Sequence, residues 1–589
     1  MRWRSLPALV ALLASACDAD ALNGLAESGV IMADDPTNSE PSLDGSLAPP
    51  HTTQADAGPN AAPADGAMST LADSGAAAAQ PEPAKCAELG ATAKSCTTCT
   101  HQGWVQGLSE KSTCTFLGIP YAKPPIGPLR WTAPKPAEGW QGVREATRYG
   151  AACAQTPDLS FAESTSEDCL FLNVYAPTAA PKEPLPVMVF VHGGGYVGGA
   201  ANLYGGKGLS ERGPVVVVTL NYRVGPLGLF AHPELDRERG SDPSGSDAIR
   251  DQQLALRWVR DNVSGFGGDP HNVTLFGESA GAGAVGVHQV SPLSRGLVRR
   301  FILESGSSTK SPKNGLEPMS REAMYETTRR MAQDLCPGAA NVMSCLRGLP
   351  VDQILAWEPA ATNGDAGSAQ AGLSWGPVVE GAGGVLPDQP EALIKAGRYN
   401  KGEILIGTNK NEFALFQLLP TIFSLADLKA QVESQFGARA AEIVPLYQAI
   451  AQSDPIQAYI TMMTDIMFRC SARRMARMAQ AQGETVYLYS FEEGSAAHAD
   501  ELLFVFGPEN MAGDLAGALP LWSASLVADM QRYWVNFAYR GDPNGPQLAS
   551  WPRYDAKSDR HMTLVDPPAA SSGLQKGACD FWDRYVDGP

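Results

Sequence analysis

The fold of this chain is decided by a short stretch, Phe276-Gly277-Glu278-Ser279-Ala280-Gly281. An apolar, β-branched run at 273–276 leads into it, and small residues from Ala280 to Val287 lead out of it. The pattern predicts a strand, a sharp turn that carries Ser279, and a helix, which together form a nucleophile elbow. Gly-x-Ser-x-Gly can also arise by chance in a chain with 60 glycines, but the strand before it and the helix after it favour the elbow.

The length and composition allow a large folded core. The chain has 589 residues, of which 44% are hydrophobic and 18% are charged, so a sizeable core can form. The formal net charge is -18, and no run of Lys and Arg compensates for it. Phosphate backbones repel such a surface, and we therefore expect no nucleic-acid partner.

The first residues resemble an export signal. A short basic start at 1–4 precedes an apolar stretch, Leu6 to Ala14, that is too short to span a bilayer. The small residues before Cys17 predict a lipobox in residues 1–17, with Cys17 as the lipidated residue. We expect an exported, bacterial membrane-anchored lipoprotein in the periplasm or on the cell surface. The alternative is ordinary cleavage near Ala16, which would give a secreted protein.

Two further regions follow the signal. Residues 18–85 are rich in Ala, Pro, Ser and Gly and have almost no aromatic residues, so they cannot bury enough apolar surface to fold. We interpret them as a flexible tether, with a disordered binding segment as the alternative. Residues 86–589 then form one large catalytic domain.

Strand and helix patterns alternate along this domain. Uninterrupted β-branched runs at 187–191 and 215–220 predict strands that are buried on both faces of a sheet. The stretch 116–131, dense in proline and aromatic residues, predicts a structured loop. Alternation of this kind indicates an α/β fold with a mostly parallel central sheet flanked by helices. Further strands are predicted at 170–175, 301–303, 404–406 and 486–489, and helices at 247–262 and from 526 to the glycine at 541.

A serine nucleophile needs a histidine base, which follows the serine along the chain in elbow enzymes. Three of the eight histidines follow Ser279: His288, His498 and His561. His288 lies in the helix that leaves the elbow, and His561 lies in an alternating run typical of a strand. His498 follows a predicted strand in a loop, where catalytic residues of open α/β sheets gather, so it is the predicted base.

The acid and the oxyanion donors also lie beyond predicted strand ends. Glu412 follows the strand at 404–406, and Glu380 is its rival. His192-Gly193-Gly194-Gly195 follows the strand at 187–191 and offers bare backbone N–H groups. The N–H of Ala280, directly after the nucleophile, is a further candidate donor.

Several stretches together resemble one known family. They are Phe116-Leu-Gly-Ile-Pro-Tyr-Ala-Lys-Pro-Pro, Ser166-Glu-Asp-Cys-Leu-Phe-Leu-Asn173, His192-Gly-Gly-Gly, Asn221-Tyr-Arg-Val, and Phe266-Gly-Gly-Asp-Pro followed by Thr274-Leu-Phe-Gly-Glu-Ser-Ala-Gly281. Residues 105–585 resemble the type-B carboxylesterase/lipase family, which includes cholinesterases and bacterial p-nitrobenzyl esterases. The resemblance implies an α/β-hydrolase fold and a serine carboxylesterase that hydrolyses carboxylic esters, its small-molecule substrates, through an acyl-enzyme.

The resemblance also assigns residues. It implies Glu412 as the acid, from an Asn-Lys-x-Glu stretch, and His498 as the base, six residues before Phe504-Val-Phe-Gly507. It implies Gly194, Gly195 and Ala280 as oxyanion donors. No metal or organic cofactor is expected. The rival class is a catalytically inactive adhesion protein of the same fold, which typically lacks the nucleophile.

Disulfide bonds are the default for ten cysteines in an exported chain. The resemblance implies three pairs, Cys153–Cys169, Cys336–Cys345 and Cys470–Cys579. Four cysteines depart from the family pattern, and the three ways of pairing them stay open. A zinc site at Cys96-Thr-Thr-Cys99 is the weaker alternative. These four are Cys86, Cys96, Cys99 and Cys114.

The departures from the family bear on the substrate. The loop between Cys153 and Cys169 contains no tryptophan, so choline recognition by a cation–π contact is not expected. The positions that resemble the acyl-pocket aromatics are Ala371 and Leu373, which predict a roomier pocket. The sequence carries no signal for an oligomeric state or for the natural ester.

Overall fold

The computed structural model describes residues 95–156, 164–313, 315–357, 375–415, 422–511 and 523–588. The chain divides into two units between Pro81 and Glu82, and all described residues belong to the second unit. The predicted signal and tether, residues 1–85, lie outside the described residues, as do Cys86 and both predicted acyl-pocket positions, Ala371 and Leu373.

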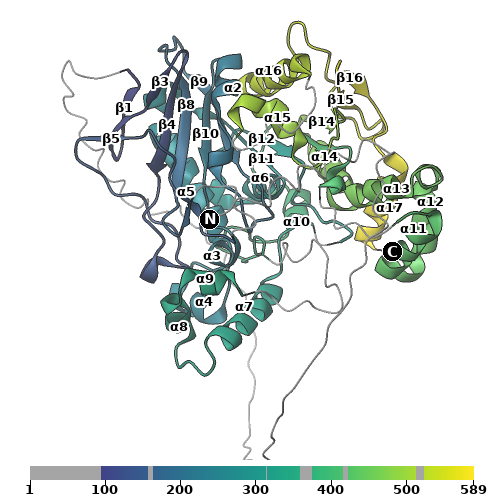
Figure 1. The fold of residues 1–589 in the computed structure, drawn as a ribbon, viewed down its shortest axis with the longest axis horizontal. Coiled ribbons are helices and arrows are strands. Elements are labelled where there is room, and N and C mark those ends of the chain that lie inside the picture. Colours follow the sequence, from purple (N-terminus) through teal and green to yellow (C-terminus); the bar gives the residue numbers. More distant parts are fainter. Residues whose placement is uncertain are drawn as a thin grey trace, which may run out of the picture. The chain divides into compact units, whose positions relative to one another are not determined.

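One sheet of eleven strands runs through the described residues (Figure 1). Its seven central strands, from β15 through β11 and β9 to β10, pair in parallel, and antiparallel strands extend both edges. In sheet order the strands are β16 (Ala569–Ser571), β15 (His561–Leu564), β14 (Val486–Phe491), β13 (Ile404–Asn409), β12 (Arg300–Glu304), β11 (Gly268–Glu278), β9 (Leu185–Val191), β10 (Val216–Leu220), β8 (Phe171–Pro177), β4 (Thr113–Pro120) and β3 (Leu108–Glu110). A second, small sheet joins β1 (Thr97–Thr100), β2 (Gly103–Gln106) and β5 (Val143–Glu145).

The predicted strands are confirmed, although most of their boundaries differ from the prediction. β11 begins at Gly268 instead of at 273, because Gly268 pairs with Leu185 across a bulge that the apolar pattern does not reveal. The stretch predicted as a loop at 116–131 begins inside β4, which pairs with β8 through residue 120. The mostly parallel sheet of the α/β prediction is thus present.

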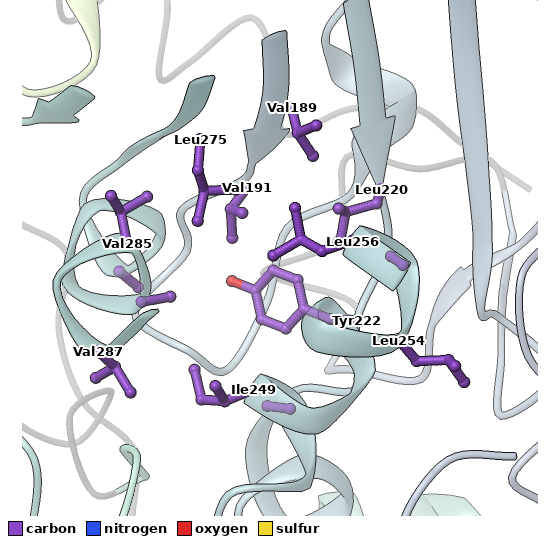
Figure 2. Packing of buried hydrophobic residues seen from close by; sticks show 14 of the residues in the cluster. Val189, Val191, Leu220, Tyr222, Ile249, Leu254, Leu256, Leu275, Val285 and Val287 are labelled. Atoms are coloured by element: carbon purple, nitrogen blue, oxygen red, sulfur yellow. The ribbon is translucent and has the colours of Figure 1, made fainter. Parts of the chain in front are cut away.

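Helices cover both faces of the sheet. Because side chains alternate along a buried strand, Val187, Val189 and Val191 of β9 pack on one face while Met188 and Phe190 pack on the other. Figure 2 shows the first face, where strand residues meet apolar side chains of the helices at 247–262 and 280–290. The predicted helix 247–262 is confirmed, and so is the late helix, which ends at Gly541 in a left-handed conformation. The helices are α2 (Lys207–Arg212), α3 (Gly225–Gly228), α4 (Pro233–Arg239), α5 (Asp247–Asn262), α6 (Ala280–Val290), α7 (Arg321–Leu335), α8 (Val342–Gly348), α9 (Val351–Leu355), α10 (Pro390–Lys395), α11 (Leu425–Phe436), α12 (Ala440–Ala451), α13 (Pro455–Thr464), α14 (Cys470–Ala481), α15 (Asp500–Phe506), α16 (Ala524–Arg540) and α17 (Lys576–Asp587).

The last helix is fixed to the body of the domain by several kinds of contact. Helices α11, α12, α13 and α17 share a separate apolar cluster and gather on one side of the sheet (Figure 1). The disulfide Cys470–Cys579 joins α14 to α17. Arg473 of α14, fully buried, donates to Asp559 at 2.8 Å and to Asp580 of α17 at 2.7 Å. Among the described residues, no helix combines the length and the apolar character needed to cross a bilayer.

Candidate active site

Ser279 lies on the sharp turn between β11 and α6, as predicted. Its backbone has φ 56° and ψ -123°, a conformation that is strained for a residue with a side chain. The Ser279 N–H donates to the carbonyl of Glu304 at the end of β12, at 2.9 Å, and this bond helps to hold the turn. A Cβ at Gly281 would overlap the Val191 carbonyl, so the close approach of α6 to β9 requires glycine there.

The structure brings His498 and Glu412 together. Nδ1 of His498 lies 2.6 Å from Oε2 of Glu412, and the other carboxylate oxygen of Glu412 accepts the N–H of Asn409 at 2.7 Å. Glu412 follows β13 and His498 follows β14, two neighbouring parallel strands, so both come to the same edge of the sheet. Phe468 packs on the imidazole, with 4.8 Å between ring centroids. The ring is therefore held in place by a carboxylate on its Nδ1 side.

Glu278, the residue before Ser279, was not anticipated as part of the site. Its Oε1 lies 3.1 Å from Nε2 of His498, so the imidazole lies between two carboxyl groups. Burial raises the pKa of Glu278 well above its ordinary value, and the carboxylates of Glu412 and Glu304 raise it further. A neutral Glu278 can contact Nε2 without placing a second negative charge beside the ring.

Two more buried glutamates lie behind these groups. Trp534 of α16 donates to Glu304 at 2.5 Å, and Ser305 donates to Glu501 at 2.8 Å, while Asn409 also donates to Glu501. Burial raises the pKa of Glu501 to about 8, with Glu412 and Glu278 adding to the effect. The pKa of Glu304 is raised by burial and by Glu501. Sequence reasoning missed this cluster, although Glu278 and Glu304 are the last residues of adjacent parallel strands, a signal that could have found them.

The glycine loop after β9 curls beside the elbow. Gly194 has φ 103° and Gly195 has φ 61°, conformations that favour glycine. A Cβ at Gly193 would lie 3.0 Å from the Cβ of Ser279, which shows how close the loop comes to the nucleophile. Within the described part of the chain, the N–H groups of Gly194, Gly195 and Ala280 have no hydrogen-bond acceptor.

The start of this loop is held in place by contacts between His192 and Tyr222. The two rings are stacked with 4.3 Å between centroids, and the Tyr222 hydroxyl donates to the His192 carbonyl at 2.7 Å. Nδ1 of His192 lies 2.9 Å from the carbonyl of Gly193, and burial lowers the pKa of His192 to about 4. The ring is therefore neutral near pH 7 and adds no charge to the site.

The rival candidates lie in other surroundings. Glu380 is buried and accepts two hydrogen bonds from Arg250, at 2.7 and 3.0 Å. His288 lies in α6 and contacts Ser294 at 2.8 Å and Gln252 at 2.9 Å, and His561 lies in β15 with its Nδ1 3.1 Å from the Asp559 carbonyl. All three therefore have structural partners.

The described cysteines form disulfide bonds. Cys153–Cys169, Cys336–Cys345 and Cys470–Cys579 are the pairs that the resemblance implies, and Cys96–Cys114 is a fourth bond, left open by the sequence. The one group of potential metal ligands in the described ranges is Asp465 with Cys470 and Cys579. Because both sulfurs are already in a disulfide, they do not provide thiolate ligands.

Comparison with known proteins corrects one expectation from the sequence. The chain is 33% identical to "Cocaine esterase" of Oryctolagus cuniculus over 83% of this chain and 95% of that one. It is 32% identical to "Fatty acyl-CoA hydrolase precursor, medium chain" of Anas platyrhynchos, over 83% and 92%. The expected bacterial lipoprotein anchored through Cys17 is wrong, because these relatives are animal enzymes and the similarity does not point to a bacterial anchor. Cys17 itself lies outside the described residues, and the disulfides agree with an oxidising environment.

A bacterial relative and a family profile complete the comparison. The chain is 35% identical to "Para-nitrobenzyl esterase" of Bacillus subtilis (strain 168), over 80% of this chain and 96% of that one. The Carboxylesterase family profile matches residues 94–582, which include the sheet, the elbow and the glycine loop. The predicted family, α/β-hydrolase fold and enzyme class are confirmed: this chain is a carboxylic ester hydrolase that belongs to the carboxylesterase family.

Proposed function

We propose that the chain hydrolyses carboxylic esters with Ser279 as nucleophile, His498 as base and then acid, and Glu412 as the group that orients His498. Oγ of Ser279 bonds to the ester carbonyl carbon while its proton passes to Nε2 of His498. The tetrahedral intermediate expels the alkoxy group, which takes that proton from His498 and leaves as an alcohol. Water then attacks the acyl-enzyme by the same route, releasing the acid and restoring Ser279.

The observation that carries this proposal is the distance of 2.6 Å between Nδ1 of His498 and Oε2 of Glu412. A proton on Nδ1 that is held by a carboxylate leaves Nε2 with its lone pair, as a base requires. Glu278, the neighbour of Ser279 in the chain, touches that Nε2, so the base faces the elbow. Catalytic hydrogen bonds to the serine often tighten only when substrate binds.

We further propose that the N–H groups of Gly194, Gly195 and Ala280 stabilise the oxyanion. Their lack of an acceptor among the described residues supports this role, since preorganised donors beside a nucleophile can bind the negative charge that develops there. Losing one such donor typically lowers kcat by about 10²–10³-fold.

The test is turnover of p-nitrophenyl acetate and p-nitrophenyl butyrate by the purified protein and by Ser279→Ala. We expect the variant to lose all but a residual rate while keeping its melting temperature. Equal rates in the two proteins would overturn the mechanism.

A separate test measures which acyl groups the enzyme prefers. Ala371 and Leu373 stay predicted pocket positions, and the small side chains predict acceptance of acyl groups larger than acetyl. The names of the relatives suggest aryl and fatty acyl groups as the substrates to try first. A panel of p-nitrophenyl esters of graded acyl length should show kcat/KM rising beyond acetate, and a decline from acetate onward would contradict the roomy pocket.

We also propose that residues 86–589 form the catalytic unit, behind a signal in residues 1–17 and a tether at 18–85. The family match from residue 94 onward supports the catalytic part. A truncated protein that begins at residue 86 should keep the kcat of the full chain, and a large loss would contradict this division.

A further inference from the structure

The glycine loop that supplies the proposed oxyanion donors is held at its far end by one buried side chain. Gln155, 4% exposed, donates through Nε2 to the carbonyl of Gly199 at 2.9 Å. Its Oε1 accepts the Gly199 N–H at 2.9 Å, so the amide pairs with both polar groups of that residue. Nε2 also donates to the carbonyl of Cys153, again at 2.9 Å.

Gly199 in turn touches the beginning of the same loop. Its φ is 99°, and a Cβ there would lie 2.5 Å from both the Gly193 carbonyl oxygen and Nδ1 of His192. The neighbouring carbonyl of Gly198 lies so close to Gly194 that a Cβ on Gly194 would overlap it. The backbone of residues 198 and 199 therefore packs directly against residues 193 and 194.

The contacts continue to the nucleophile. A Cβ at Gly193 would lie 2.5 Å from Oε2 of Glu278 and 3.0 Å from the Cβ of Ser279. A contiguous series of close contacts thus runs from Gln155 through Gly199 and Gly193 to Ser279. Because each of these glycines approaches its neighbours too closely to leave room for a Cβ, a shift at Gly199 should displace the N–H groups of the loop.

We propose that Gln155 is a positioning residue that sets the direction of the Gly194 and Gly195 N–H groups, and this inference rests on the proposed function. Gln155 also ties the loop to the segment closed by the Cys153–Cys169 disulfide, two residues away. It touches no reacting atom, and it acts only through the backbone at 199. Substituting Gln155 should therefore lower kcat, which depends on stabilising the oxyanion. It should change KM, which reflects substrate binding here, only weakly.

The test uses Gln155→Met, which keeps the length of the side chain and removes all three hydrogen bonds. The matched control is Gln480→Met. The side-chain amide of Gln480, on α14, likewise donates to one backbone carbonyl, that of Tyr554 at 3.1 Å, and accepts one backbone N–H, that of Ala556 at 3.0 Å. The readouts are kcat and KM for p-nitrophenyl butyrate and Ki for an alkyl trifluoromethyl ketone, which forms an oxyanion when the serine adds to it. Rates are divided by the concentration of active sites.

For Gln155→Met we expect kcat to fall by about 10–100-fold, since donors are misdirected but not lost, with KM within about twofold. The Ki of the trifluoromethyl ketone should rise by the same factor as kcat falls, and Gln480→Met should change neither. Unchanged kcat and Ki per active site would overturn the inference even if the melting temperature fell, because that result indicates a structural role only.

A second variant at position 155 and the Ser279→Ala control complete the test. If Gln155→Met does not yield folded protein, Gln155→Glu retains the acceptor for the Gly199 N–H and loses the donor to the carbonyls of Gly199 and Cys153. It should show a smaller fall in kcat and a rise in Ki by that same smaller factor, and wild-type values would overturn the inference. Activity that persists in Ser279→Ala would instead refute the proposed function, so the two failures can be told apart.

Discussion

Replacing Glu412 by glutamine should reverse the proton position on the imidazole of His498, the proposed base. The Asn409 N–H lies 2.7 Å from Oε1 of Glu412 and needs an acceptor there, so the amide oxygen of the new side chain takes that place. The amide nitrogen then faces Nδ1 of His498, where a carboxylate oxygen now lies at 2.6 Å. Facing a donor, Nδ1 gives up its proton, and Nε2 carries it instead.

The size of the effect follows from this change of tautomer. An imidazole with its proton on Nε2 cannot accept the proton of Ser279, and the variant has also lost the charge that stabilises the imidazolium. The same carboxylate-to-amide change in a serine protease triad lowers kcat by about 10⁴-fold, which corresponds to about 5.4 kcal/mol of activation free energy. We expect a loss of this order in kcat for p-nitrophenyl butyrate, with KM nearly unchanged.

Glu380→Gln is the matched control, because Glu380 is the rival acid and is equally buried. Its carboxylate pairs with Arg250, so the substitution weakens a buried ion pair and should lower the melting temperature. The kcat of each active site should stay within about twofold of wild type. A Glu412→Gln enzyme that retains more than a tenth of the wild-type kcat, or a Glu380→Gln enzyme as slow as Glu412→Gln, would refute the assignment.

Three further predictions follow from other contacts. Gly193→Ala should lower kcat by at least about 10²-fold without unfolding, because its Cβ would lie 2.5 Å from Oε2 of Glu278 and push the loop away; circular dichroism and steady-state rates check this. Glu501 has a pKa raised from its ordinary 4.5 to about 8, so the folded state holds a proton that the unfolded state loses, and stability falls as pH rises from about 4.5 to about 8. Glu501→Gln should flatten this fall and melt at a higher temperature than wild type at pH 8, and a lower melting temperature there would contradict the sign. Arg473→Met leaves the buried Asp559 with only Lys576, at 3.9 Å, as a cation among the described residues and should cost about 3–5 kcal/mol in urea unfolding.

Much of the architecture could be predicted because the apolar runs are long and uninterrupted. The run at 187–191 can be satisfied only in a strand covered on both faces, and β9 is buried along its whole length. Strand beginnings were harder, since Gly268 joins β11 through a bulge that leaves no apolar pattern. The elbow was predictable because its motif has glycine at 277 and 281, where a Cβ would overlap the Val191 carbonyl of the neighbouring strand.

The candidate site was predicted only where chain order or a motif constrains it. Elimination among the histidines pointed to His498, but chemistry alone could not separate Glu412 from Glu380. Their surroundings in the three-dimensional structure differ, because Glu380 has a cationic partner in Arg250 while Glu412 lies against the imidazole of His498. Glu304 could be suspected only from its place at a strand end, and hydropathy gives no reason to bury Glu501 beside other carboxylates.

The disulfide between Cys470 and Cys579 closes a loop with a sequence separation of 109, and His498 lies inside it. Cross-linking a loop of about 100 residues lowers the entropy of the unfolded chain by an amount worth about 4.7 kcal/mol. A protease that cuts once anywhere between these cysteines would produce two pieces that stay covalently joined. The nicked enzyme would migrate as one band until a reducing agent separates it, and the proposed base would stay bonded through sulfur to the body of the domain even after the backbone is cut.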